Sequence, residues 1–296
     1  GRAAWTRLFD EKIAELRFSI GDAELNMAEA LDKLSNKHAN TRKIAAKEIS
    51  KVLNDNVRLF SLITNTLTKD KAIEDNWRCY NSPVSARNRV NHVEDDVVDA
   101  LVETVTSNYK KLSHRYYALK AKWMGVEKLN YWDRNAPLPE SDDTIIDWSE
   151  AREIVLNAYK SFSPALASIG QQFFDKRWID APTRSGKASG AFSHPTVPSS
   201  NPFILLNYQG KLRDVMTLAH ELGHGVHQVL ASRQGCLMAD TPLTLAETAS
   251  VFGEMLTFQS LLERNKTDHT KRKIMIASKV EDMLTTAVRQ VAFHEF

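Results

Sequence analysis

Helical periodicity fills the first third of the chain. At residues 40–67, apolar side chains recur at steps of three and four residues, which is the spacing of one buried face on an amphipathic helix. Proline is nearly absent before Pro83, where it signals a break because it pushes the preceding residue away from helical angles. We therefore predict an all-α N-terminal portion at residues 1–90 and a second portion at residues 91–296.

The middle of the chain continues this pattern, with loops between the helices. A helix is predicted at residues 93–124 that stops at Gly125, because glycine commonly follows the last helical residue. Residues 131–143 contain two prolines and several acidic residues, which predicts a loop. The next helix is expected to begin at Asp147 or Ser149, since either side chain can cap a first turn.

The pattern changes after Asp180, where proline, glycine and serine become frequent. Residues 202–208 then form a short apolar run bounded by turn residues, which favours a strand over a buried piece of loop. From Leu212 the helical period returns and continues to Phe296, with one interruption at residues 235–242. The whole pattern predicts a mainly α protein with a short β-strand element.

Composition limits the kind of protein that this pattern builds. The chain has 296 residues, of which 43% are hydrophobic and 26% charged, as in folded chains with a core. Its net charge of +2 is too small to indicate a nucleic-acid partner or a basic membrane patch. The apolar runs are also far too short for a membrane span. Cys79 and Cys236 lie far apart in the sequence, which argues against a disulfide framework and predicts a cytoplasmic protein.

One helical segment contains residues that indicate metal chemistry. His220-Glu221-Leu-Gly-His224 has the spacing His-Glu-x-x-His. At about 100° per residue, the two histidines stand about 40° apart on one helix face and one turn from each other, so both can bind one ion. Glu221 lies beside that face, where its carboxylate can hold a metal-bound water and act as a general base.

A third ligand is expected from the following helix. The metzincin pattern needs a glycine and then a histidine after the second histidine of the motif, and His227 and Leu230 occupy those positions instead. A gluzincin takes a glutamate, and Glu247 follows the turn at residues 235–242. If the two helices pack antiparallel, Glu247 returns to the level of the histidines. The segment around Glu247 is otherwise apolar, and a buried carboxylate is rare unless it is paired or bound to metal. We therefore favour a metal ligand for Glu247 over the alternative, an ion pair with an arginine.

Two further side chains are candidates for supporting contacts. Glu254 lies on nearly the same helix face as Glu247 and could accept the free N–H of a metal-bound imidazole. The alternative is that Glu254 is an ordinary solvated charge on the helix surface. His227 is expected to be a core or supporting histidine and not a ligand. A fourth protein ligand would close the position that catalytic zinc keeps for water.

Four segments form a distinctive set. They are Gly186-Lys-Ala-Ser-Gly190-Ala-Phe192, Pro202-Phe-Ile-Leu-Leu-Asn-Tyr208, Leu212-Arg-Asp-Val-Met-Thr-Leu-Ala-His-Glu-Leu-Gly-His224 and Leu245-Ala-Glu-Thr-Ala-Ser250. Together they resemble the oligoendopeptidase F branch of the thimet oligopeptidase-like metallopeptidases. The resemblance implies a multi-helix gluzincin-type peptidase with a short β-strand element near its active site, one zinc ion per chain and cleavage of short peptides at internal bonds. It places the zinc ligands on His220, His224 and Glu247, and the general base on Glu221.

The resemblance also implies a substrate-binding strand and a longer protein. In this family an edge strand lies alongside an extended peptide. The positions that match it are Gly190, Ala191, Phe192, Leu206, Asn207 and Tyr208. Family members are considerably longer and carry a later loop, with histidine and tyrosine, that donates hydrogen bonds to the tetrahedral intermediate. The chain is therefore expected to be an interior part of a longer protein, and to be weakly active or inactive alone.

The predicted function is that of a zinc-dependent endopeptidase acting on short peptides. Two alternatives remain open, a zinc-binding but inactive helical interaction protein and another gluzincin such as an aminopeptidase. The first would bind zinc without cleaving peptides, and the second would require a free amino terminus on its substrate. A homo-oligomer is also open.

Overall fold

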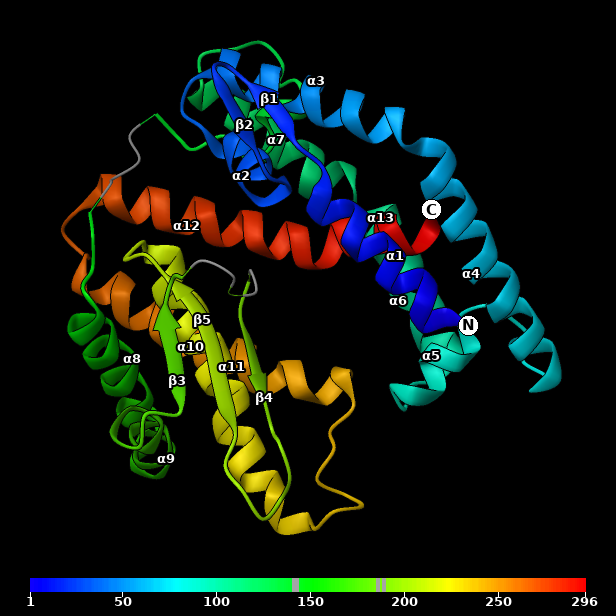
Figure 1. Cartoon of the computed structure of the whole chain (residues 1–296). Coiled ribbons are helices and arrows are strands. Elements are labelled where there is room, and N and C mark those ends of the chain that lie inside the picture. The colour runs from blue at the N-terminus through cyan, green and yellow to red at the C-terminus, as the bar shows by residue number, and fades with distance from the viewer. Residues whose placement is uncertain (140–143, 185–186, 188–189) are drawn as a thin grey trace. The chain divides into compact units, whose positions relative to one another are not determined.

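Helices form most of the chain, as the hydrophobic pattern predicts (Figure 1). The structure is a computed structural model, and it describes residues 1–139, 144–184, 187 and 190–296. Internal contacts divide the chain into two units, Gly1–Ser141 with Ser278–Phe296, and Asp142–Ala277. The boundary predicted near residue 90 falls within the first unit and stays a prediction. No helix in the described residues combines the length and the apolar character needed to cross a membrane.

The first unit is built from helices and one hairpin. The hairpin pairs β1 (Phe18–Ile20) with β2 (Ala23–Leu25) in antiparallel fashion. The helix α12 (His269–Leu284) begins in the second unit and ends in the first. The other helices of this unit are α1 (Arg2–Glu15), α2 (Met27–Asp32), α3 (Ala39–Asp55), α4 (Val57–Trp77), α5 (Ser85–Val90), α6 (Asp95–Ser107), α7 (Arg115–Trp123) and α13 (Gln290–Glu295).

The hairpin shows that the prediction of an all-α first third is wrong. Phe18 and Ile20 are buried while Ser19 between them is exposed, which is the alternation of a strand. Gly21 closes the turn with a φ of +66°, a conformation that glycine adopts without a steric penalty. Three residues of alternation are too few to stand out from the helical periodicity around them.

The long helices predicted from periodicity are also interrupted in the structure. The stretch at residues 40–67 is divided at Asn56 and the stretch at residues 93–124 at Asn108. Each asparagine donates its side-chain amide to a carbonyl four residues earlier, at 2.9 and 2.8 Å, which ends the helix locally without disturbing the apolar period. Residues 265–268 add a second break after Leu212, between α11 and α12.

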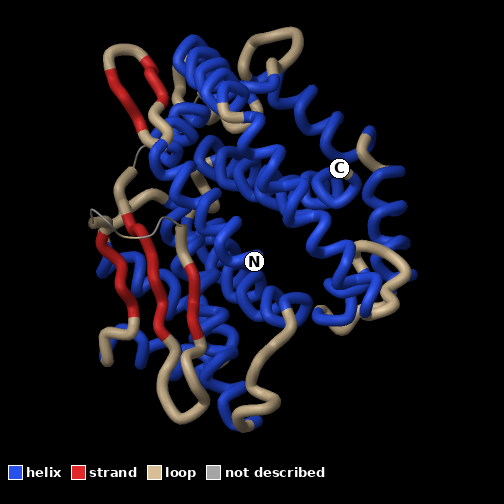
Figure 2. Tube along the Cα trace, turned by 45° about the vertical axis from the view of Figure 1, so that its right-hand side comes forward, coloured by secondary structure: helices blue, strands red, loops and turns tan. Residues whose placement is uncertain are grey.

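The second unit contains helices and a small sheet. The helices are α8 (Trp148–Phe162), α9 (Pro164–Asp175), α10 (Leu212–Ala231) and α11 (Leu243–Arg264), and the strands are β3 (Ile179–Pro182), β4 (Phe192–His194) and β5 (Phe203–Tyr208). The central strand β5 runs parallel to β3 and antiparallel to β4, and the three strands lie side by side in Figure 2. The strand predicted at residues 202–208 is therefore confirmed. The cap at Asp147 is confirmed as well, because its carboxylate accepts the N–H of Glu150 at 2.8 Å.

One face of α10 lies in the core of this unit. The sheet lies against α10 (Figure 1), and β5 contributes Ile204 and Leu206 to the same cluster of buried residues. Each aliphatic side chain removed from water in this way contributes about 1.5–3 kcal/mol to folding. The helix is thereby fixed along its length. Its buried apolar residues are Val215, Leu218, Leu222 and Val226.

Tyr159 of α8 contacts both α10 and α11. Its hydroxyl is fully buried and donates to the carbonyl of Ala219 in α10 at 2.6 Å. A Cβ at Gly253 of α11 would lie 2.1 Å from that hydroxyl oxygen. Only glycine leaves room for the phenol at this point, so the tyrosine and the glycine together set how α8 meets α10 and α11.

A buried ion pair stabilises the first unit. Arg42 of α3 is only 2% exposed and donates Nε and Nη2 to Asp133 at 3.1 and 2.7 Å. Asp133 also accepts the N–H of Asn130 at 3.1 Å. Burial by itself raises the pKa of Asp133, but the hydrogen bonds from Arg42 and Asn130 outweigh burial and hold that pKa below its usual value.

We expect Asp133→Asn to destabilise the protein, because it leaves the buried guanidinium of Arg42 without a negative partner. The loss in the free energy of unfolding should be about 3–5 kcal/mol, measured by urea denaturation. Asp147→Asn is the matched control, since Asp147 is exposed and asparagine also caps helices. Equal losses in the two variants would contradict the assignment.

Candidate metal centre

Two histidines and a glutamate converge where α10 meets α11. The rings of His220 and His224 lie 5.0 Å apart between centroids, at an interplanar angle of 83°. Glu247 Oε2 lies 3.3 Å from His220 Nε2 and 3.5 Å from His224 Nε2. One potential ligand atom of each residue lies within 4.8 Å of the other two. In the described part of the chain, no other group of His, Cys, Asp or Glu side chains is gathered so closely.

Gly223 allows α11 to approach α10 at this point. A Cβ on Gly223 would lie 2.7 Å from the carbonyl oxygen of Ala249 and 2.8 Å from the Cα of Ser250. Both are backbone atoms, which cannot move aside unless the helix moves. Because Gly223 directly precedes His224, and Ala249 lies on the same helix turn as Glu247, this close approach sets the distances within the cluster.

Two members of the cluster have a further side-chain partner. His220 Nδ1 lies 3.3 Å from Glu254 Oε2. Glu247 Oε2 accepts the hydroxyl of Ser250 at 2.8 Å. Partners of this kind hold imidazole rings and carboxylates in one orientation. Glu254 thus lies where the helical spacing predicts, and its supporting role in metal binding stays a prediction.

Charges around the cluster move the two imidazoles in opposite directions. Burial lowers the pKa of His220, but the hydrogen bond to Glu254 and the charges of nearby glutamates outweigh burial and raise that pKa above its usual value. Burial lowers the pKa of His224, and the neighbouring histidines lower it further against the attraction of Glu247. The cluster therefore combines a concentration of negative charge with an imidazole that favours its neutral, metal-binding form.

Glu221 is buried beside the cluster and is not one of its three members. Its residue exposure is 7%. Burial raises the pKa of Glu221 and the charge of Glu247 raises it further, whereas His220 and a hydrogen bond from the backbone N–H of Ser193 act in the opposite sense. The structure thus places Glu221 off the ligand face, as the spacing of the motif predicts.

The other predicted site residues have varied surroundings. His227 is half-buried in α10 and does not belong to the cluster. Gly190 and Ala191 lead into β4, and Phe192 is its first residue. Leu206, Asn207 and Tyr208 belong to β5. Residues 186, 188 and 189 of the first motif lie outside the described residues.

Strand β5 lies between β3 and β4 in the described sheet. Its pairing with β4 covers Phe203, Ile204 and Leu205, whereas Tyr208 is paired with Pro182 of β3. The substrate-binding role of residues 190–192 and 206–208 therefore stays a prediction. An outer edge next to α10 belongs to β4.

Sequence reasoning did not identify three residues around the site. The hydroxyl of Ser250 donates to Glu247, and Ser193 of β4 is hydrogen-bonded to Gln228 of α10. For Ser250 and Gln228 a signal exists in their helical spacing, because they follow Glu247 by three residues and Glu221 by seven. The position of Ser193 depends on the pairing of β4 with β5, which no local pattern reports.

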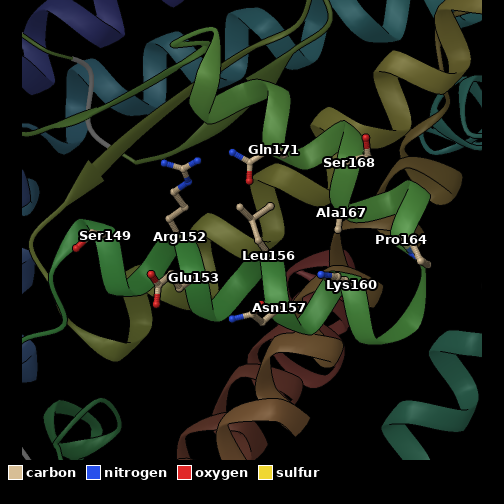
Figure 3. A pocket seen from close by; sticks show the side chains of 10 residues that line it. All are labelled: Ser149, Arg152, Glu153, Leu156, Asn157, Lys160, Pro164, Ala167, Ser168 and Gln171. Atoms are coloured by element: carbon tan, nitrogen blue, oxygen red, sulfur yellow. The ribbon is translucent and has the colours of Figure 1, made fainter.

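A cavity in the second unit lies apart from the cluster. A cavity of about 630 Å³ lies between α8 and α9 (Figure 3). Its lining includes Arg152, Glu153 and Lys160 but none of the cluster residues. Arg152 is already paired with Asp175 at 3.0 Å. The chemistry therefore points to the cluster and not to this cavity.

A His-Glu-x-x-His helix followed by a helix with a glutamate is the arrangement of gluzincin-type metallopeptidases. The chain belongs to peptidase family M3, whose sequence model matches residues 33–296.

Curated relatives agree with this assignment. An oligoendopeptidase F homolog of Lactococcus lactis is 30% identical over 271 residues, which are 89% of this chain and 43% of the relative. The oligopeptidase PepF of Bacillus subtilis is 30% identical over 218 residues, which are 73% of this chain and 32% of the relative. The chain thus spans less than half the length of these curated relatives.

Solved structures share the fold. A putative peptidase from Chlamydophila abortus aligns with a TM-score of 0.78 and 25% identity over 99% of this chain and 49% of the other. PZ peptidase A, solved with an inhibitor, aligns with a TM-score of 0.82 over 99% of this chain and 53% of the other. At 19% identity, the second likeness shows the fold alone.

We expect Gly223→Ala to weaken metal binding and folding together, because the new Cβ must displace the backbone of α11. The loss in the free energy of unfolding should be about 1–3 kcal/mol, with a raised dissociation constant for Zn²⁺ by isothermal titration. Gly170→Ala is the matched control. It also lies in a helix of this unit, and its Cβ would meet only the ends of Leu222 and Leu156 side chains at 3.3 and 3.4 Å. Unchanged Zn²⁺ affinity in Gly223→Ala would show that the close approach does not set the cluster.

Proposed function

We propose that this chain carries the catalytic centre of a zinc-dependent endopeptidase that hydrolyses internal bonds of short peptides. The observation that carries the proposal is the convergence of His220, His224 and Glu247 with Glu221 buried beside them. Family membership and the oligopeptidase names of the relatives support the substrate class. Since the chain spans less than half of these relatives, the activity of the whole protein is part of the proposal.

The donor set fits zinc. Two imidazole nitrogens and one carboxylate oxygen are the protein ligands of a common type of catalytic zinc site, which keeps a fourth position for water. His220 and His224 turn Nε2 towards Glu247, and the contact of His220 Nδ1 with Glu254 orients the ring of His220. A zinc ion in such a site lowers the pKa of a coordinated water towards about 7 and polarises a carbonyl oxygen.

Glu221 is the general base in this proposal. It adjoins the ligand His220 along α10 and is only 7% exposed. Glu221 takes a proton from the attacking water and later delivers it to the amine that leaves. Its burial limits exchange of that proton with solvent.

The free edge of β4 is the place for the peptide backbone. Phe192 and His194 are partnered with Leu205 and Phe203 of β5, and backbone groups alternate in direction along a strand. Ser193 and Ala191 therefore face the other edge. The carbonyl of Ser193 accepts Nε2 of Gln228 in α10, so in this proposal Ala191 is the residue that pairs with an extended substrate.

We also propose a cytoplasmic location. Cys79 and Cys236 are both exposed and free, which fits a reducing compartment.

Glu221→Gln should abolish most of the turnover while it leaves zinc bound, because glutamine keeps the shape of the side chain but cannot accept a proton. We expect kcat to fall by a factor on the order of 100 to 10,000. The measurements are cleavage of a quenched internal peptide and zinc content by atomic absorption. Glu153→Gln on α8, whose carboxylate lies outside the cluster, is the control. Loss of zinc together with activity would count against the role of Glu221.

Chelation should remove the activity, and added Zn²⁺ should restore it. The substrate should be a short peptide acetylated at its amino terminus, with products identified by mass spectrometry. We expect internal cleavage of the blocked peptide, because a backbone-pairing edge does not need a terminal amine. Cleavage only of peptides with a free amino terminus would favour an aminopeptidase. Zinc binding without any cleavage would favour a zinc-binding interaction protein.

A further inference from the structure

The hydroxyl of Ser250 has two acceptors, and both belong to Glu247. It lies 3.0 Å from the main-chain carbonyl oxygen of Glu247 and 2.8 Å from Oε2 of its carboxylate. Oε2 is also the atom that lies 3.3 Å from His220 Nε2 and 3.5 Å from His224 Nε2. The hydroxyl therefore contacts the oxygen of Glu247 that faces both imidazoles.

Packing fixes Ser250 in place, whereas burial does not fix the side chain of Glu247. Ser250 is fully buried at the close approach of α10 and α11, where a Cβ on Gly223 would lie 2.8 Å from the Cα of Ser250. The side chain of Glu247 is 44% exposed. Several rotamers are open to a half-exposed glutamate, and holding it in one of them costs conformational entropy. A hydrogen bond from a fixed neighbour favours the rotamer in which Oε2 faces the histidines.

The burial of the hydroxyl does not by itself explain its contact with the carboxylate. A buried hydroxyl in a helix can donate its one proton to a carbonyl of the preceding turn. Thr257, which is fully buried in the same helix, does so with the carbonyl of Gly253 at 3.0 Å. Ser250 has the carbonyl of Glu247 at the same distance and still lies closer to the carboxylate. The shorter contact links Ser250 to the side chain of Glu247 and not only to the helix.

We propose that Ser250 is a positioning residue for metal binding, which holds the carboxylate of Glu247 towards His220 and His224. This role rests on the proposed function, in which those three residues bind zinc. Ser250 acts through Glu247 and supplies no ligand itself. Without the hydroxyl, the carboxylate would turn towards water more often, and part of the binding free energy of the metal would be used to restore the rotamer.

The test is the affinity of the metal-free protein for Zn²⁺, measured by competition with a chromophoric chelator, with folding checked by circular dichroism. In Ser250→Ala we expect the dissociation constant to rise about tenfold, as when other contacts that orient a metal ligand are lost. Thr257→Val is the matched control, because it also removes a fully buried hydroxyl from α11, but one that donates to Gly253 and not to the cluster. Unchanged affinity in a folded Ser250→Ala variant, or an equal change in the two variants, would overturn the inference.

The Glu247→Ala background separates this inference from the proposed function. Glu247→Ala alone should weaken Zn²⁺ binding more than Ser250→Ala does, because it removes a ligand. Adding Ser250→Ala should then change the dissociation constant no further, since no carboxylate is left to hold. Equal losses in both backgrounds would overturn the positioning role. Unchanged affinity in Glu247→Ala would refute the proposed ligand set and the positioning role with it, whereas a loss in Glu247→Ala with none in Ser250→Ala would refute the role of Ser250 alone.

Discussion

The contact between the backbones of α10 and α11 is the constraint on which the site depends. At Gly223 the helices are so close that even a methyl group would overlap the backbone of Ala249. Glu247 is therefore brought to the two histidines by the packing of main chains and not by the flexibility of its own side chain. The apolar face of α10 holds that helix from its other side, and Tyr159 links both helices to α8. The metal centre is thus a consequence of how three helices fit together.

The same packing gathers charges that would otherwise repel each other. Glu221, Glu247 and Glu254 all lie near His220, and their charges raise its pKa. In a region that is partly shielded from water, such a group of carboxylates opposes folding unless cations balance it. A divalent ion bound as proposed by His220, His224 and Glu247 would supply that balance. Metal binding and folding of the second unit are therefore expected to be linked.

The chemistry of the site could be predicted from sequence because its elements are local. The histidines and Glu221 lie within one helix, where a fixed angle per residue decides which side chains share a face. The prediction of Glu247 as a third ligand required only the assumption that the next helix packs antiparallel to the first. The breaks at Asn56 and Asn108 could not be found in the same way, because a side-chain hydrogen bond ends each helix while the apolar period continues. Ser193 could not be identified for a related reason, since its contact with Gln228 of α10 depends on the pairing of β4 with β5.

The contact between Tyr159 and Gly253 limits which substitutions this chain can accept. The phenol occupies the space that any larger side chain at position 253 would need, and its hydroxyl donates to the carbonyl of Ala219 immediately before a predicted metal ligand. A substitution at either position alone therefore creates a clash or a cavity next to the cluster. A side chain at position 253 requires a smaller residue at position 159. Two residues without a role in the proposed chemistry thus restrict the sequences that can carry the cluster.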